Sequence, residues 1–212
     1  GRGVDVQRFS PTRRDWGWRY RLSGGQPERP LLLYVGRLSP EKQVERLADV
    51  MDLLPQASLA VVGDGPARRS LELRLAGRNV AFTGYLSGYA LAAAYASADV
   101  FVFPGPHETF GNVVLEAMAS GLPVVGPRAG AVPELIQHEV NGLLFDPARQ
   151  TAMPEAVLRL LHQPRLARRL GRKARQDASE RRWDRVVDDL LQRYQGLLRP
   201  GAAVDRPASA AW

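Results

Sequence analysis

The chain has 212 residues, 45% of them hydrophobic and 24% charged, and a formal net charge of +7. This length and composition suit a soluble globular protein of one or two domains that buries its own core. Because the chain contains no Cys, a disulfide scaffold, a thiol nucleophile and a thiolate zinc site are excluded.

Short apolar runs alternate with helical patterns along most of the chain. The runs predicted as strands are 31–35, 57–62, 80–83, 100–103, 123–125 and 142–145. The segments predicted as helices are 41–54, 66–75, 91–96, 112–120, a short helix from 132, 151–162, 164–178 and 184–198. This alternation is typical of βαβ units, and strands that are apolar throughout fit a parallel sheet covered on both faces. We therefore predict a doubly wound α/β domain with a mainly parallel, Rossmann-like sheet of about six strands and C-terminal helices.

The domain organisation follows from this order of elements. Residues 1–28 are predicted to be an interdomain linker segment, 29–198 the α/β domain with its terminal helices, and 199–212, rich in Ala and Pro, a disordered tail. The Arg-rich stretch 165–185 is interpreted as solvated surface spread around all helix faces. The chain begins with Gly instead of Met, so we expect a piece of a longer polypeptide. No apolar run approaches the ~20 residues that cross a bilayer, and no signal segment opens the sequence, so we expect a cytoplasmic protein.

The position of a ligand site can be predicted from the sheet. In an open α/β sheet, ligands bind beyond the carboxyl ends of the strands, where the strand order reverses. For the common order 3-2-1-4-5-6, which we assume, this point brings together the loops 36–42 and 104–112. Arg37 and Lys42 in the first loop would suit a diphosphate, or they are solvated loop residues. The second loop leads into a helix, and Gly111 would let a phosphate approach the first amides of that helix.

Two carboxylates flank this predicted helix start. Glu116 lies in an otherwise apolar helical run and therefore needs a polar partner. Glu108 either caps the helix or accepts hydrogen bonds from sugar hydroxyls. His107 is interpreted as a loop residue and not as a catalytic base. Two alternatives stay open: a glycosidase whose two carboxyl groups lie ~5–9.5 Å apart, and a non-catalytic module whose basic surface binds nucleic acid or anionic lipid.

Four stretches resemble the nucleotide-sugar-binding half of retaining glycosyltransferases of family 4, which have the GT-B fold. They are 3–11, which is similar to the family's linker, 36–42, 63–66 and, most specifically, 108–125, which opens with the E-x7-E motif of Glu108 and Glu116. The resemblance covers about residues 1–198. Gln43 departs from the Gly that often follows the Lys in this family. The family's first domain, which carries the acceptor site and a histidine implicated in catalysis, is missing.

The resemblance implies a role for each matching residue. Arg37 and Lys42 would bind the donor diphosphate, Glu108 the hydroxyls of the donor sugar, and Glu116 those of the ribose. The other donor contacts that it implies come from Gly36, Thr109, Phe110, Gly111, Asn112 and Val113, and from Gly84 and Leu86 beside the base. Arg37, Lys42 and Glu108 would serve catalysis, because positive side chains and a helix terminus stabilise the leaving diphosphate. No metal or other cofactor is implied.

The resemblance also indicates the partners. The donor would be a UDP- or GDP-linked hexose, and the acceptor a glycan or lipid held by the missing N-terminal domain. Acceptors of this kind are compatible with peripheral contact at the inner membrane face, and no nucleic-acid partner is expected. A related GT-B enzyme such as a sugar epimerase would differ in its products. We expect the isolated chain to bind donor nucleotide but to transfer little or no sugar.

Overall fold

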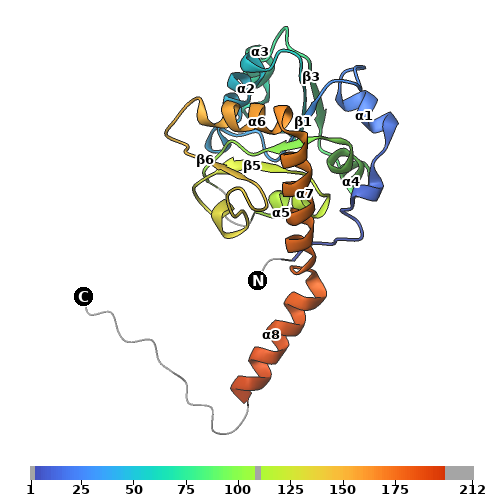
Figure 1. Ribbon diagram of the computed structural model, residues 1–212, viewed down its shortest axis with the longest axis vertical. Helices are drawn as coiled ribbons and strands as arrows, with labels where there is room; N and C mark the ends of the chain where they lie inside the picture. The colour runs from blue at the N-terminus through green and yellow to red at the C-terminus, as the bar shows by residue number, and fades with distance from the viewer. Residues whose placement is uncertain (1–2, 108–110, 199–212) are drawn as a thin grey trace, which may run out of the picture.

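The computed structural model describes residues 3–107 and 111–198, and it shows one six-stranded parallel sheet between two layers of helices (Figure 1). The strands are β1 (Leu31–Val35), β2 (Ser58–Val62), β3 (Val80–Gly84), β4 (Val100–Val102), β5 (Val124–Pro127) and β6 (Leu143–Phe145). Their order is β3-β2-β1-β4-β5-β6, and every neighbouring pair is parallel. This confirms the predicted doubly wound α/β fold. It also confirms the strand order that we assumed, so the order reverses between β1 and β4.

The helices cover both faces of the sheet. They are α1 (Trp16–Leu22), α2 (Leu47–Leu53), α3 (Arg68–Arg74), α4 (Gly88–Ser97), α5 (Asn112–Ala119), α6 (Ala152–His162), α7 (Pro164–Ser179) and α8 (Trp183–Leu198), with the 3-10 turns η1 (Pro11–Arg13), η2 (Pro40–Lys42), η3 (Val44–Arg46) and η4 (Val132–Glu134). Crossover connections are right-handed, so α2 and α3 lie on one face of the sheet and α4 and α5 lie on the other. On the first face α6 contacts α2, and on the second face α1 packs on α4. α7 contacts both α6 and α5.

The core lies in the central strands. β1, β2, β4 and β5 are buried along their whole length, whereas the edge strand β3 is only half-buried. Tyr34 and Phe103 stack with ring centroids 6.5 Å apart, and Phe101 and Phe103 stack at the same separation. These rings fill the space beneath the point where the strand order reverses, and they support the loops above it.

The helix predicted over 41–54 is wrong in its first half. Gln43 has φ 48° and ψ 39°, in the left-handed region, and it separates η2 from η3, so that α2 begins only at Leu47. A left-handed residue cannot continue a right-handed helix. The chain therefore makes one separate turn after β1, and this turn carries Lys42. The short helix predicted from 132 is likewise a single 3-10 turn, η4.

Residues predicted as a linker segment pack against the domain. Leu22 of α1 is fully buried, and Phe9 packs edge-on against Tyr95 of α4, with centroids 5.6 Å apart. Arg19 of α1 is also buried and pairs with Asp99, which precedes β4. Their role as a linker between domains stays a prediction, and the predicted tail 199–212 lies outside the described residues.

The interpretation of 165–185 as surface on all helix faces is wrong for one face of α7. Leu170, Gly171, Ala174 and Ala178 are buried there. A Cβ at Gly171 would overlap with the carbonyl oxygen of Gly121, so only glycine lets α7 cross so close to the end of α5. The opposite face of α7 is exposed and rich in Arg.

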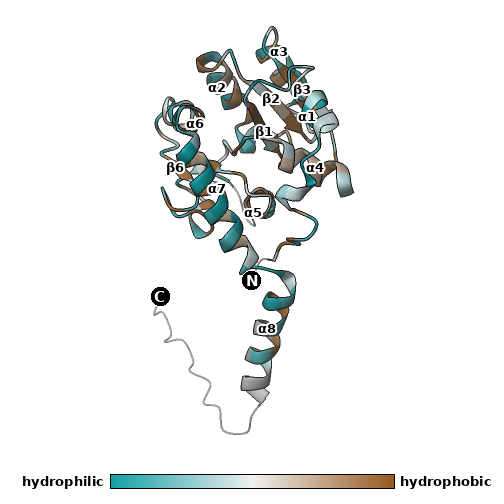
Figure 2. Cartoon of the chain, turned by 45° about the vertical axis from the view of Figure 1, so that its right-hand side comes forward, coloured by the Kyte–Doolittle hydropathy of each residue, from teal (hydrophilic) through white to brown (hydrophobic). Residues whose placement is uncertain are grey.

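The start of the described chain lies beside the start of α8. The amide of Val4 donates a hydrogen bond to the carbonyl oxygen of Arg181 (2.9 Å), and Val4 forms an isolated bridge with Arg182. α8 projects away from the rest of the molecule (Figure 2). It exposes apolar side chains, among them Val187 and Leu191. Among the described residues, no helix combines the length and the apolar character needed to cross a membrane.

Candidate functional site

The two loops predicted to form the site lie in contact where the strand order reverses. The Nζ of Lys42 donates a hydrogen bond to the carbonyl oxygen of His107 (2.8 Å) and lies 5.9 Å from the centre of the Phe103 ring. A Cβ at Gly105 would lie 2.6 Å from the carbonyl oxygen of Lys42. The backbones of the two loops therefore touch, and the juxtaposition predicted from the strand order is present.

The first loop gathers positive charge around one carboxylate. Ser39 Oγ donates a hydrogen bond to Glu41 Oε1 (2.6 Å), and this bond is the main cause that lowers the pKa of Glu41. The charges of Arg37 and Lys42 lower that pKa further, so both cations lie near the same group. Tyr34 Oη donates to the carbonyl oxygen of Arg37 (3.0 Å), which anchors the loop to β1 while the Arg37 side chain stays exposed.

Glycines at the ends of three strands form a close-packed backbone surface beside this loop. The amide of Gly36 donates to Val62 (3.0 Å), and that of Gly63 donates to Gly84 (2.8 Å). A Cβ at Gly63, where φ is 126°, would overlap with the carbonyl oxygen of Gly36. Leu86 follows β3 and packs, partly buried, against the core. The missing side chains of Gly36 and Gly63 thus make room for neighbouring protein atoms, whereas at Gly84, where an added Cβ would meet only Arg68 Nη1 at 3.9 Å, a ligand can approach the backbone.

The second loop ends at the start of α5. Gly111 has φ 67° and ψ 22°, and its carbonyl oxygen accepts the first helical bond, from the amide of Leu115 (3.0 Å). Because glycine has no side chain to cap the helix, the first amides of α5, at Asn112 and Val113, are available to an anion. Glu108, Thr109 and Phe110, which were predicted to contact the donor, lie outside the described residues.

Glu116 has the polar partner that its apolar surroundings demanded. Tyr95 Oη donates a hydrogen bond to Glu116 Oε2 (2.9 Å). Burial raises the pKa of Glu116, while this hydrogen bond and the charge of Arg8 oppose the rise. Tyr95 and Arg8 were not predicted as site residues. The only signals were a hydroxyl in the Ala-rich helix α4 and a basic residue in the presumed linker, and neither indicates Glu116 without the fold.

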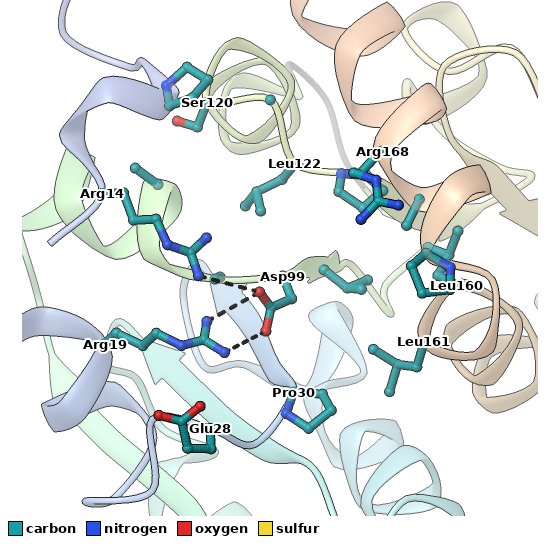
Figure 3. Close-up of a pocket in the computed structure, with 18 residues that line it drawn as sticks. Arg14, Arg19, Glu28, Pro30, Asp99, Ser120, Leu122, Leu160, Leu161 and Arg168 are labelled. Carbon is teal, nitrogen blue, oxygen red and sulfur yellow. Dashed lines mark hydrogen bonds and ion pairs between the residues drawn. The ribbon is translucent and has the colours of Figure 1, made fainter. Parts of the chain in front are cut away.

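A separate cavity of about 470 Å³ lies at the opposite edge of the sheet, by the amino ends of the strands (Figure 3). None of the predicted site residues lines it. On its wall, Asp99 accepts hydrogen bonds from both terminal nitrogens of Arg19 (3.2 and 2.9 Å) and from the amide of Leu31 (2.9 Å). Arg19 also donates to the carbonyl oxygens of Pro27, Ser97 and Arg29. This ion pair is thus fully engaged in tying α1 to the sheet.

Metal ligands do not gather anywhere in the part of the chain that the structure describes. Within 3–107 and 111–198, no group of three or more acidic or histidine side chains could hold a metal ion. The charged groups at the carboxyl edge include Arg37, Lys42 and the half-buried Glu116, with Glu41 beside the two cations, and the helix terminus at Gly111 lies at the same edge. Such a set can bind a phosphorylated ligand that also carries hydroxyl groups.

Comparison with known proteins identifies the family. Residues 21–177 match the family described as "Glycosyl transferases group 1", so the chain belongs to this family. It is 45% identical over 185 residues to sulfoquinovosyl transferase SQD2 of Arabidopsis thaliana, which covers 86% of this chain and 36% of that protein. It is also 45% identical over 199 residues to a GDP-mannose-dependent alpha-mannosyltransferase of Mycolicibacterium smegmatis, which covers 93% of this chain and 51% of that protein.

A solved structure with related sequence has the same architecture. Sucrose-phosphate synthase from Thermosynechococcus elongatus superposes with a TM-score of 0.81 and 30% identity, covering 92% of this chain and 51% of that one. The chain therefore spans between 36% and 51% of the length of these three relatives, and it corresponds to about half of a GT-B glycosyltransferase.

Proposed function

We propose that this chain is the donor-binding domain of a retaining hexosyltransferase of family 4, and that it binds a nucleoside-diphosphate sugar at the carboxyl edge of its sheet. The observation that carries the proposal is the contact between the two loops at the β1–β4 switch point, where Lys42 bonds to the carbonyl oxygen of His107. This contact brings the loop that carries Arg37 and Lys42 beside the loop that leads into α5. The family membership and the mannosyltransferase relative, whose name specifies GDP-mannose, support a nucleotide-sugar donor.

Each part of the site would meet one part of such a donor. Arg37, Lys42 and the amides at the start of α5 would hold the diphosphate and stabilise the charge that develops as it leaves, which is electrostatic catalysis without a metal. Glu116, oriented by Tyr95, would accept hydrogen bonds from the ribose hydroxyls. The glycine-lined surface at Gly84 would border the base. Glu108 keeps its predicted role toward the sugar hydroxyls.

Calorimetry with UDP and with GDP tests the site. We expect binding in the micromolar to millimolar range, ~4–8 kcal/mol, with a preference for one base. Arg37→Ala and Glu116→Ala should each weaken binding about 10- to 100-fold, since hydrogen bonds to charged groups contribute about 1.5–3 kcal/mol. Arg69→Ala, which removes an exposed cation on α3, is the matched control and should bind like the parent. If all three variants bind like the parent, the site assignment is wrong.

Activity assays test the proposal that donor binding and acceptor binding belong to different domains. We infer that the acceptor, a glycan or lipid, is held by the part of the relatives that these 212 residues do not span, so the 212 residues alone should bind nucleotide without robust sugar transfer. Rapid turnover by the isolated chain on a simple acceptor would contradict this. Product analysis of a full-length relative carrying this domain would report whether the anomeric configuration is retained.

A further inference from the structure

A second feature of the molecule, unrelated to the donor site, is a basic and aromatic surface around the cavity in Figure 3. Besides the buried Arg19, two guanidinium groups line this cavity from opposite walls: Arg14 precedes α1, and Arg168 lies on α7 (Figure 3). Arg14 is 3.9 Å from Asp99 and its side chain is 45% exposed, while Asp99 is already satisfied by Arg19. Arg168 forms no hydrogen bond or ion pair with any described residue. The cavity thus has two cations that are not fully neutralised.

Arginines continue from the cavity along the exposed face of α7. Arg165, Arg169 and Arg172 lie three, one and four residues from Arg168, and all four side chains are exposed. Residues three and four apart share one face of a helix, so these side chains form a single stripe. The acidic residue of α7, Asp177, is bound instead by Lys173 (2.7 Å). The stripe therefore carries concentrated positive charge.

Large aromatic side chains continue the surface on its other side. The Arg14 guanidinium lies 5.9 Å from the ring centre of Trp16, so this ring adjoins the cavity. Trp16 is 62% exposed, and Tyr20, one turn further along α1, is 58% exposed. Water-facing Trp and Tyr beside Arg are the combination found at membrane interfaces, where the rings enter the headgroup layer and the cations meet lipid phosphates. A single α-helical turn separates the two rings, which makes them neighbours on one face.

We propose that this surface, formed by Arg14, Trp16, Tyr20, Arg165, Arg168, Arg169 and Arg172, docks on an anionic phospholipid bilayer. Charge complementarity selects the partner, because arginines outnumber the nearby carboxylates, of which Asp99 is paired and Glu28 lies at the rim. Asp99 lies beside Arg14 in this cavity, and the apolar side chains of Leu122, Leu160 and Leu161 line it toward Arg168 (Figure 3). Cations beside apolar side chains match an amphiphile, whose phosphate headgroup and acyl chains can contact both, better than a nucleic acid, which has no hydrocarbon chain to place against the leucines.

Vesicle co-sedimentation of the 212-residue chain tests this proposal. The chain should sediment with phosphatidylcholine vesicles that contain phosphatidylglycerol, not with phosphatidylcholine alone, and the binding should weaken at high salt. Replacing Arg165, Arg168 and Arg172 with Gln should lower the partition coefficient about 100-fold, since each basic residue contributes about a factor of five at an anionic surface. Trp16→Ser with Tyr20→Ser should lower it about tenfold.

The matched control removes the same charge from the opposite edge. Arg69, Arg128 and Arg149 are exposed and lie outside the surface, so changing them to Gln should leave vesicle binding unchanged. Circular dichroism of every variant should match the parent. Equal loss in the control variant, or equal binding to neutral vesicles, would overturn the proposal, as would tight binding of a single-stranded oligonucleotide without vesicle binding. Nucleotide binding measured by calorimetry is a separate readout, so this proposal and the donor site can fail independently.

Discussion

The two edges of the sheet are built in opposite ways. At the amino edge, the buried Arg19 directs its donors to Asp99 and to three carbonyl oxygens, and the groups form a fixed anchor between α1 and the strands. At the carboxyl edge, backbone meets backbone through glycines, and Arg37 extends into solvent. Charge that is saturated by protein groups stabilises the fold, whereas charge left toward solvent is available to a ligand. The contrast separates a structural ion pair from the candidate binding site in the same domain.

The largest predicted effect concerns the amino-edge anchor. Arg19→Met should lower the free energy of unfolding by about 3–4 kcal/mol, because it leaves the Asp99 carboxylate without its main partner. Arg14→Met is the control: its contact with Asp99 is 3.9 Å long and exposed, so its loss should cost less than about 1 kcal/mol. Urea unfolding measures both. Equal losses in the two variants would contradict the anchor.

The next largest effect tests the close packing of the backbone at the carboxyl edge. Gly63→Ala should lower the free energy of unfolding by about 2–3 kcal/mol, because it adds strain at a positive φ and an overlap with the Gly36 carbonyl oxygen. Gly77→Ala supplies the comparison: φ is 78° there, and no atom lies within 4 Å of the added Cβ. It should cost only about 1 kcal/mol. A cost at Gly63 no greater than that at Gly77 would mean that the loops are not closely packed.

A pH profile tests the buried carboxylate of the site. Burial raises the pKa of Glu116 above its ordinary 4.5, so the folded state binds more protons than the unfolded state just above that pH. The stability contributed by the protonated group is therefore present at lower pH and is lost as the pH rises through the folded-state pKa. Glu116→Gln should remove this decline in thermal unfolding profiles and make the protein at least as stable at neutral pH.

For Asp15 we expect stability to depend on pH in the opposite direction from Glu116, and the same thermal unfolding profiles measure it. The amide of Trp18 donates a hydrogen bond to Asp15 and lowers its pKa below 3.8. Its contribution is therefore present at neutral pH and is lost as the pH falls through the folded-state pKa. Asp15→Asn should remove that acid-side loss and leave the Glu116 decline intact. For the Glu116 prediction, a pH profile of Glu116→Gln that runs parallel to the parent's would show that the Glu116 carboxylate is not buried.

The smallest predicted effect is a gain in stability. Gln43 adopts the left-handed region at φ 48°, which costs a residue with a Cβ about 1–2 kcal/mol, whereas Gly adopts it freely at some entropic cost. Gln43→Gly should therefore raise the free energy of unfolding by about 0.5 kcal/mol. Gln176→Gly, on the exposed face of α7, should lower it by about 1 kcal/mol. The same sign for both would mean that Gln43 is unstrained.

The alternation of short apolar runs with helical patterns was enough to predict the sheet. Apolar runs that end in Gly, such as the one before Gly36, marked the strands, and the common doubly wound order placed the two loops together. The helix over 41–54 was mispredicted because Gln does not itself indicate a left-handed conformation, and the Gly that the resembling family often has at position 43 was not taken as a sign of one. The partner of Glu116 was beyond prediction for a different reason. Tyr95 is 21 residues away in sequence, and only the packing of α4 beside α5 brings the two side chains into contact.

The hydrogen bond between Val4 and Arg181 joins the first described residues to the base of α8. The same short segment carries Arg8, whose charge lowers the pKa of Glu116. The base of the projecting helix α8 and the carboxylate of the candidate site are therefore linked through residues 4–8 of the chain.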